Sequence, residues 1–498
     1  MDTKLDFTRV ISKTSFARGW QCEKFLWLHK YQSELKEERD SPEGKILKEL
    51  GNPVFEWFKK RYPEGKSCGK FGERDEEKDW LGSIELTRQL LDQGEKALFY
   101  PSFLVDDLMC DVHCLVKEKE GWVIYLVKIA SRLSDRSVRN AAFQYYVLQK
   151  EIPIVDVRFA LIDRHYERQG AIDPQKLFKI RSVSHRIEKL IPEIDKKVAL
   201  FRKVLKQEKV PRRKIGNQCT EPLPCDFKSV CWKDVPENSI FELVGLPKDR
   251  MFEYWKDGVK KIADIPRDEE ISFSQKIQMD GHRRVEKKGV QHFIDSVQYP
   301  ALFIDFEGYL PSLPPFDGLR PFDLIPFLFA GYLMESPKGK AKLVEFLCTP
   351  GQDPRREFCE AFLNAARSAK TLLVYDPLTE QNVLKKLAQT FPEHADEIND
   401  IRSRIVDLSL PIRRKDFYLP EMKGYHSMKQ VLPAIKPHKH YQDLEIMTGR
   451  AAAYMFQVIQ ENLNHPENEN RMNDLKAYCR RDAEGLVHIF RAFEAAAE

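Results

Sequence analysis

The sequence predicts an α/β protein, because strand-like and helix-like segments alternate in both halves of the chain. Between residues 104 and 162, two strand-like runs are followed by a helical stretch and a third strand-like run. From residue 299 onward, three strand-like runs precede a helix, a strand and further helices. The helical stretches repeat apolar residues at three- and four-residue steps, whereas the strands are short apolar runs.

Residues 1–235 are the first predicted domain. Its first helix covers FARGWQCEKFLWLHKY, and Ser12 and Thr14 precede it as capping residues. The runs LVDDLMCDVHCLVKE and WVIYLVKIA are predicted strands on either side of a turn at Gly121. A helix over VRNAAFQYYVLQKE and a strand over PIVDVRFALI follow.

Residues 236–298 are charged and mostly helical, and we expect them to connect two domains. The last predicted domain is residues 299–498, with strands in ALFIDFEGY, PFLFAGYLME, AKLVEFLCT and TLLVYD. Helices are predicted over PRREFCEAFLNAARS and TEQNVLKKLAQTF, and a long helix starts at about Met472. Three parts suit a chain of 498 residues, since domains average about 150 residues.

The composition is that of a globular protein. Lys and Arg total 81, and Asp and Glu total 77, so the formal net charge of +4 requires any basic surface to be local. Hydrophobic residues make up 42%, which is enough for several cores and excludes a disordered chain. No apolar run approaches the roughly 18 residues that span a bilayer, and the first residues contain no signal core. We expect a cytoplasmic protein without membrane contact.

Two carboxylates lie on one predicted strand. Asp305 and Glu307 are two positions apart in ALFIDFEGY, so their side chains share a face. Like charges beside an apolar core are costly, and a pair of divalent cations is a common compensation. The alternative is a strand end whose carboxylates reach solvent beside Gly308.

Another carboxylate, Asp482, lies in the apolar stripe of the last predicted helix. Tyr478 is one turn earlier on the same side, where its hydroxyl can hold a water molecule while Asp482 binds metal. The alternative is an aspartate at the mouth of the core that Arg480 or Arg481 neutralises. The stripe that contains Asp482 consists of Leu475, Cys479, Leu486, Phe490 and Phe493.

A further acidic group follows the strand TLLVYD. Pro377 favours the start of a helix, so Glu380 lies in its first turn and Asp376 at the end of the strand. Either carboxylate can face the site. Glu380 can equally be a favourable charge at a helix N-terminus.

Three of these segments resemble the exonuclease motifs of the DEDD superfamily: Asp305-Phe-Glu307, YDPLTEQNVL and Tyr478-Cys-Arg-Arg-Asp482. The spacing Tyr-x-x-x-Asp is similar to that of its tyrosine subclass. The resemblance implies a ribonuclease-H-like fold and a 3′–5′ exonuclease that uses two Mg²⁺ or Mn²⁺ ions. It implies that Tyr478 orients the attacking water and that the ions are held by Asp305, Glu307, Glu380 and Asp482.

The second motif departs from the family, which more often has Asp at the position of Glu380 and Asn at that of Asp376. The segment IVDLSLPIRRKDFYLPEMKGYHSMKQVLPAI also resembles a bacterial family catalogued mainly as a domain of unknown function. Asp407-Leu and the residues before Lys429 carry that second resemblance.

Three of the ten cysteines, Cys219, Cys225 and Cys231, are spaced with five residues between neighbours, and Cys22 lies far upstream. Four thiolates are enough for a zinc ion or an iron–sulfur cluster, although zinc ribbons favour shorter gaps. The alternative is a set of buried thiols in a proline-rich loop. One distant cysteine and a C-terminal triplet resembles the RecB-type nucleases that carry a 4Fe-4S cluster, which implies a PD-(D/E)XK-like fold for residues 1–235.

Within that resemblance, Asp111, Lys128 and Gln144 match nuclease positions, but Leu126 replaces the expected glutamate. Leucine cannot bind a metal ion, so the resemblance implies a degenerate nuclease site. Asp106 and Asp107 are nearby but lie on the preceding strand. A basic run over residues 201–214, with seven Lys or Arg and one Glu, is suited to phosphates, or is simply a solvated helix face.

The resulting hypothesis is a metal-dependent nuclease with its chemistry in residues 299–498 and an iron–sulfur domain that binds nucleic acid, with DNA preferred over RNA. One alternative is a non-catalytic scaffold that binds nucleic acid through two degenerate sites. The other is an enzyme whose activity lies in the N-terminal half, with Asp111 and Lys128 active despite Leu126. The sequence identifies no protein partner.

Overall fold

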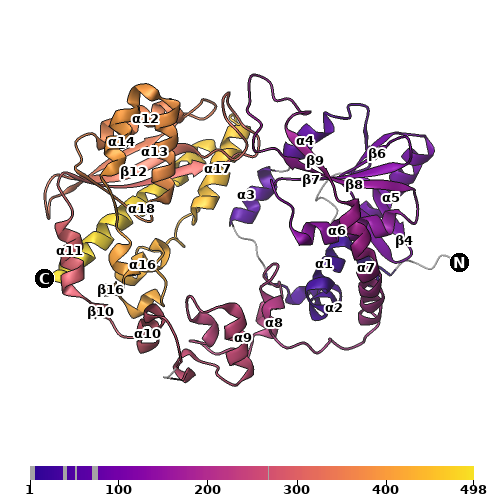
Figure 1. The fold of residues 1–498 in the computed structure, drawn as a ribbon, viewed down its shortest axis with the longest axis horizontal. Helices are drawn as coiled ribbons and strands as arrows, with labels where there is room; N and C mark the ends of the chain where they lie inside the picture. Colours follow the sequence, from indigo (N-terminus) through magenta and orange to yellow (C-terminus); the bar gives the residue numbers. More distant parts are fainter. Residues whose placement is uncertain (1–5, 38–41, 51–52, 70–76, 267–268) are drawn as a thin grey trace. The chain divides into compact units, whose positions relative to one another are not determined.

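The structure is a computed structural model, and it describes residues 6–37, 42–50, 53–69, 77–266 and 269–498 (Figure 1). The chain divides into two compact units. We call them the N-terminal unit (Met1–Arg39, Asn52–Asp234 and Ser312–Phe322) and the C-terminal unit (Asp40–Gly51, Val235–Pro311 and Asp323–Glu498). Each unit therefore includes a short segment from the other half of the sequence. Both units combine helices with sheets, which confirms the α/β class.

The N-terminal unit contains two sheets. The larger has the strand order β2-β3-β6-β7-β8-β9, in which β7 and β8 are parallel and β6 and β9 are antiparallel to their neighbours. The smaller has the order β1-β5-β4. The strands are β1 (Ile11–Ser12), β2 (Lys66–Ser67), β3 (Ala97–Phe99), β4 (Ser102–Val105), β5 (Leu108–Asp111), β6 (Cys114–Lys117), β7 (Trp122–Lys128), β8 (Ile154–Ile162) and β9 (Phe178–Ser182).

The run LVDDLMCDVHCLVKE, predicted as one strand, lies in three strands, β4, β5 and β6. The chain turns between β4 and β5, where Asp106 has a left-handed φ of 56°. Because the turn reverses the chain, Leu104 pairs with Met109 in an antiparallel ladder. The prediction of a single strand over LVDDLMCDVHCLVKE is therefore wrong, since continuous apolar character does not show where the chain reverses.

The first predicted helix is two helices. Extended backbone at Cys22, with φ of −163°, separates α1 (Lys13–Gln21) from α2 (Glu23–Tyr31). The break lets the two helices face different partners: Phe16 of α1 packs on Phe143 and Phe201, and Phe25 of α2 packs on Phe227. The other helices of this unit are α4 (Pro53–Lys59), α5 (Glu77–Asp92), α6 (Asp135–Leu148), α7 (Ser184–Val204) and α8 (Lys228–Cys231).

The connecting region is mainly helical, as predicted. It contains α9 (Lys248–Lys256), α10 (Phe273–Asp280) and α11 (Lys287–Asp295). A small apolar cluster around Ile240 and Tyr254 stabilises its first part. The whole region belongs to the C-terminal unit. Its last part packs on the rest of that unit, because β10 (Arg284–Val285) pairs with β16 (Phe417–Tyr418) and Phe293 of α11 packs on Phe493.

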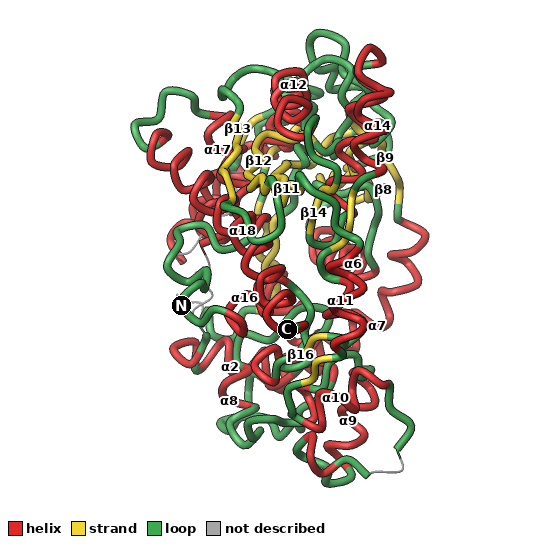
Figure 2. Tube along the Cα trace, turned by 90° about the vertical axis from the view of Figure 1, so that its left-hand side faces the viewer, coloured by secondary structure: helices red, strands yellow, loops and turns green. Residues whose placement is uncertain are grey.

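The C-terminal unit is built on a five-stranded sheet with the order β13-β12-β11-β14-β15 (Figure 2). The strands β11, β12 and β13 form an antiparallel meander, whereas β14 and β15 run parallel to β11. The bounds are β11 (Ala301–Tyr309), β12 (Ile325–Met334), β13 (Ala341–Leu347), β14 (Thr371–Val374) and β15 (Ile405–Asp407). The central position of β11 buries both of its faces.

Helices cover both faces of this sheet (Figure 1). On one face, α12 (Arg355–Ala366), α13 (Leu378–Thr390) and α14 (Ala395–Ser403) pack on alternate residues of β11, namely Leu302, Ile304 and Phe306. On the other face, α18 (Asn468–Ala497) packs on Ala301 and Phe303. Because side chains alternate along a strand, Asp305 and Glu307 also point to the face that α18 covers.

The remaining helices of the C-terminal unit are α3 (Pro42–Leu50), α15 (Leu410–Arg413), α16 (Met428–Ile435) and α17 (Gly449–Glu461). The helix α3 packs against α17 although some 400 residues separate them in sequence, and Arg471 pairs with Glu49 at 2.9 Å. Among the described residues, no helix is long and apolar enough to cross a membrane.

Candidate metal centre

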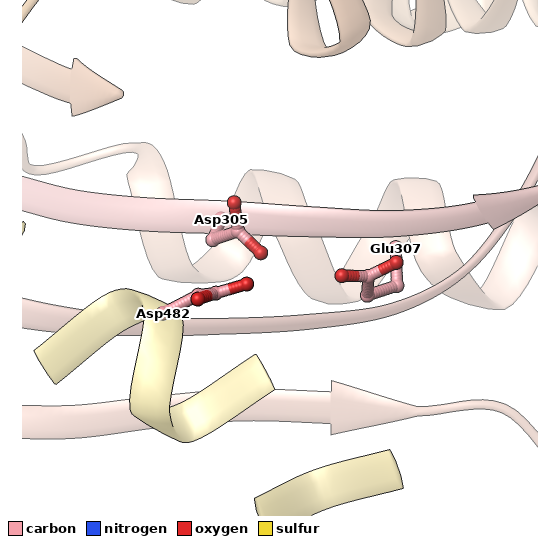
Figure 3. A group of neighbouring side chains, drawn as sticks. All are labelled: Asp305, Glu307 and Asp482. Atoms are coloured by element: carbon pink, nitrogen blue, oxygen red, sulfur yellow. The ribbon is translucent and has the colours of Figure 1, made fainter. Parts of the chain in front are cut away.

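Three carboxylates meet between the sheet and the last helix of the C-terminal unit. Asp305 and Glu307 project from β11, and Asp482 projects toward them from α18 (Figure 3). One oxygen of each carboxylate lies within 4.8 Å of one oxygen of each of the others. Glu307 is 7% exposed and Asp482 is 4% exposed, so Glu307 does not reach solvent beside Gly308. Carboxylate oxygens at this spacing suit a hard divalent cation.

Burial makes this cluster of negative charge costly. Burial, followed by the charge of Asp482, raises the pKa of Asp305 well above its usual value, and the same two causes raise the pKa of Glu307. Burial also raises the pKa of Asp482. Without a bound cation these carboxyls therefore tend to keep protons, because each ionised neighbour disfavours the ionisation of the next. A divalent cation would compensate the charge directly.

Two tyrosines donate hydrogen bonds to Asp482. The Tyr441 hydroxyl donates to its Oδ1, and hydrogen bonds from Tyr441 and Tyr478 both act to lower its pKa. Burial, and then the charge of Asp482, raises the pKa of both tyrosines, so both hydroxyls stay protonated. The sequence had indicated Tyr478 but not Tyr441, which lies in an irregular segment with no periodic pattern.

Lys429 of α16 places an ammonium group beside the carboxylates. Its Nζ donates to the Met447 carbonyl and lies 5.1 Å and 5.0 Å from the ring centres of Tyr441 and Tyr478. Burial lowers the pKa of Lys429, whereas the charges of Asp482, Glu307 and Asp305 raise it. Sequence reasoning assigned Lys429 no role, although a lysine in the apolar run MKQVLPAI was a possible sign of one.

The two arginines form their ion pairs with other carboxylates. Arg480 pairs with Glu345 at 2.5 Å, and Arg481 pairs with Asp443 at 3.1 Å. The charge of Arg481 still lowers the pKa of Asp482, after the hydrogen bond from Tyr441, the charge of Lys429 and the hydrogen bond from Tyr478.

Glu380 faces the three carboxylates from a greater distance. It is 4% exposed, its charge reaches Asp305 and Glu307, and its Oε2 is buried without a hydrogen-bond partner in the described chain. Burial raises the pKa of Glu380 to about 7. A buried carboxylate oxygen without a partner fits a cation ligand. Asp376 is exposed, so Glu380 is the better placed of the two acidic residues.

Asp407 has a structural role in the turn after β14. Its Oδ1 accepts hydrogen bonds from the backbone N–H groups of Asp376 (3.2 Å) and Ser409 (2.8 Å). These bonds hold Asp376 in a left-handed conformation with φ of 57°. This turn also positions the first residues of α13, which include Glu380.

A glycine and a distant glutamate lie at the edge of the cluster. A Cβ at Gly449 would approach Glu307 Oε2 to 3.4 Å, so α17 begins close to the carboxylates. The hydroxyl of Thr448, the N-cap of α17, hydrogen-bonds Glu43 of α3. The helix α3 thus contacts the start of α17, which lies beside the carboxylates.

Cys479 lies beside Asp305 on the buried stripe of α18. Its thiol donates to the Asp305 carbonyl at 3.6 Å, and burial raises its pKa well above the usual value. Cys479 belongs to the predicted apolar stripe, and its raised pKa keeps the thiol protonated. Its location against Asp305 could not be inferred from spacing alone.

The four candidate cluster cysteines line one cavity in the N-terminal unit. Cys22 precedes α2, Cys219 and Cys225 are linked by a backbone hydrogen bond of 2.9 Å, and Cys231 ends α8. Burial raises the pKa of Cys225 to about 12, and the other three thiols add to this. Four cysteine thiolates are a ligand set for either a zinc ion or an iron–sulfur cluster.

The degenerate nuclease positions also lie together in the N-terminal unit. Asp111 ends β5, its side chain accepts from Lys13 Nζ at 2.7 Å, and Gln144 donates to its backbone carbonyl. Lys128 ends β7 and interacts with Asp111, while Leu126 is a core residue with 2% exposure. Asp106 and Asp107 pair with Lys150 and Arg202, so neither replaces the absent glutamate.

Residues 302–427 match the profile of a family described as Domain of unknown function (DUF2779). The matched region contains Asp305, Glu307 and Glu380 but ends before Lys429 and Asp482. No curated protein and no solved structure matches the chain.

Ionised Glu380 should destabilise the metal-free protein at neutral and higher pH. Its pKa is 4.5 without burial and about 7 in the structure, so the cost is absent below about pH 4.5 and complete above about pH 7. We expect Glu380→Gln to raise the melting temperature of the C-terminal unit by about 5 °C at pH 8 in chelator, with little change at pH 5. Differential scanning calorimetry measures this difference.

The exposed Glu357, on α12 of the same unit, provides the matched control. Glu357→Gln should leave the melting temperature unchanged at both pH values. A lower melting temperature for Glu380→Gln at pH 8 would show that ionised Glu380 is satisfied within the protein.

Proposed function

We propose that the C-terminal unit is a metal-dependent nuclease that removes nucleotides from the 3′ end of nucleic acid, with DNA as the preferred substrate. The observation that carries the proposal is the approach of Asp305, Glu307 and Asp482 within 4.8 Å of one another, with Glu307 and Asp482 buried. Mg²⁺ or Mn²⁺ ions bound there would activate a water molecule and stabilise the leaving oxygen.

The topology of the sheet supports this proposal. An antiparallel meander of three strands, followed by two parallel strands on the other side of β11, gives the order β13-β12-β11-β14-β15. This order and these directions support the proposal of a ribonuclease-H-like fold, which the motifs imply. In it, the acidic pair lies on the central strand and the last acid on the C-terminal helix, as Asp305, Glu307 and Asp482 do here.

Each neighbouring side chain has a role in the proposed reaction. Asp305, Glu307 and Asp482 would hold the metal ions, with Glu380 as the further carboxylate. The Tyr478 hydroxyl stays protonated beside Asp482, where it can orient the attacking water. Tyr441 fixes the Asp482 carboxylate. The Lys429 ammonium lies close enough to the carboxylates to attract a phosphate toward them.

We further propose that Cys22, Cys219, Cys225 and Cys231 hold a 4Fe-4S cluster in the N-terminal unit. The proposal is supported by the four thiols lining one cavity, because four cysteine thiolates are the ligands of such a cluster. The adjacent nuclease positions support a binding role rather than catalysis, because Leu126 is packed in the core where the carboxylate would be needed.

Neutralising Asp305 should abolish the proposed activity. Asp305→Asn keeps the shape of the side chain and removes one metal-binding charge, so we expect turnover to fall at least about a hundredfold. Release of nucleotides from end-labelled single- and double-stranded DNA and RNA, with Mg²⁺, Mn²⁺ or chelator, measures it. Asp376→Asn is the matched control, because Asp376 is exposed and stands only a few residues from Glu380.

Products should be mononucleotides released from the 3′ end, and a blocked 3′ end should resist. If Asp305→Asn and Asp482→Asn leave metal-dependent cleavage intact, the C-terminal site is structural. Salt-sensitive binding without any cleavage by the wild-type protein would favour the non-catalytic scaffold.

Tyr478→Phe should reduce turnover less than Asp305→Asn does. It removes one hydroxyl that contacts Asp482 but leaves all of the carboxylates and Tyr441 in place. We expect a loss of about tenfold, the size of one hydrogen bond to a charged group. The same end-labelled assay compares the two variants, and a loss equal to that of Asp305→Asn would assign Tyr478 a larger role.

Replacing one cluster cysteine should remove the iron. Cys225→Ala leaves three thiols, so we expect an anaerobic preparation to lose its broad visible absorption and most of its iron and sulfide. Cys359→Ala, at a buried cysteine of the C-terminal unit, should keep both. A colourless wild-type protein that binds one zinc ion would contradict the iron assignment.

A further inference from the structure

A cavity of about 380 Å³ lies in the N-terminal unit between α1, α6 and the loop that carries Cys225. Its volume is in the range of pockets that bind small ligands. Both helices line it with groups that suit an anion: Lys13, Thr14 and Arg18 from α1, and Arg136 and Asn140 from α6. Asp226, from the cysteine loop, is the acidic residue of its wall.

The charges around this cavity are predominantly positive. Arg18 is paired with Asp226 at 3.4 Å and Lys13 with Asp111 at 2.7 Å. Arg136 forms no ion pair with any residue that the structure describes. Burial, and then the charges of Lys13 and Arg136, lowers the pKa of Lys128, which places Lys128 in the same cluster. Three cations, Lys13, Arg18 and Arg136, therefore line the cavity together with one carboxylate, Asp226.

The Lys13 ammonium takes the place that a metal ion would need at Asp111. Its Nζ contacts Oδ1 directly, and Lys128 and Arg136 lie near enough to repel a second cation. The glutamate that would help to hold a metal is absent, because Leu126 is a core residue. An internal cation thus replaces the external one, and the excess charge around it attracts anions without any metal.

An aromatic side chain adjoins the cavity. Trp20 of α1 lines a neighbouring depression together with Arg139, Arg136 and Asn140. Arg139 and Lys197 lie 5.1 Å and 5.5 Å from the centre of the indole ring. An aromatic ring beside a row of cations is the combination that binds single-stranded nucleic acid, because bases stack on the ring while phosphates meet the cations.

We propose that this cavity binds a phosphodiester of single-stranded nucleic acid without metal, with Arg136 and Lys13 on the phosphate and Trp20 against a neighbouring base. A duplex cannot place a nucleotide in a cavity, so a single strand is the expected ligand. The inference rests on nucleic acid being the substrate of the proposed nuclease, but it does not depend on cleavage.

The test measures binding in chelator with the full-length Asp305→Asn protein, so that cleavage does not interfere. Fluorescence anisotropy with fluorescein-labelled oligothymidylate and oligouridylate should show binding to both that EDTA does not weaken. Arg136→Gln should weaken it about tenfold, the effect of one charged hydrogen bond. It should also reduce the slope of log affinity against log salt by about 0.7, as expected for one lost phosphate contact.

The control is Arg164→Gln, an identical change at an exposed arginine of the same unit, which should bind as the parent does. Lys13→Gln is a second variant with the same expected direction. The proposal is overturned if Arg136→Gln and Lys13→Gln both bind like Arg164→Gln, if EDTA abolishes binding, or if the parent protein does not bind the oligonucleotides. Because binding and cleavage are measured separately, absence of cleavage by the wild type contradicts only the nuclease.

Discussion

Asp482 reaches β11 from the middle of α18, and its meeting with Asp305 and Glu307 is the constraint on which the C-terminal unit depends. Three buried carboxylates at this distance repel one another, and burial raises the pKa of each. The protein offsets part of this cost with two tyrosine hydroxyls and with Lys429. A cation bound to the three carboxylates would compensate the rest and would stabilise the folded unit.

The two faces of β11 pack against different helices, and this packing positions the three carboxylates. One face carries Leu302, Ile304 and Phe306 into an apolar layer under α12 and α13. The other face is apolar at Phe303, where α18 packs closely, and acidic where the strand continues. Rigid packing on both sides of the strand fixes the positions of the carboxylates, which is what a metal centre requires.

In the N-terminal unit, cationic side chains of the protein compensate the charge of a carboxylate. The Asp111 carboxylate contacts Lys13 at 2.7 Å and also interacts with the charge of Lys128. One partly buried carboxylate is compensated by these cations, whereas three crowded carboxylates carry more negative charge than one lysine offsets. The same elementary rule of charge compensation thus gives one unit a site suited to cations and the other a site suited to anions.

The sequence by itself determined the features that follow from local periodicity: the α/β class, the shared face of Asp305 and Glu307, and the position of Asp482 in an apolar stripe. It also indicated that Leu126 cannot bind metal. Tertiary structure alone decided that α1 and α2 separate at Cys22 and that Arg480 and Arg481 pair with Glu345 and Asp443. It also decided that Tyr441 and Lys429 lie beside Asp482 and that Lys13 lies beside Asp111. These contacts join segments that are far apart in sequence, and no local repeat records which loops will meet.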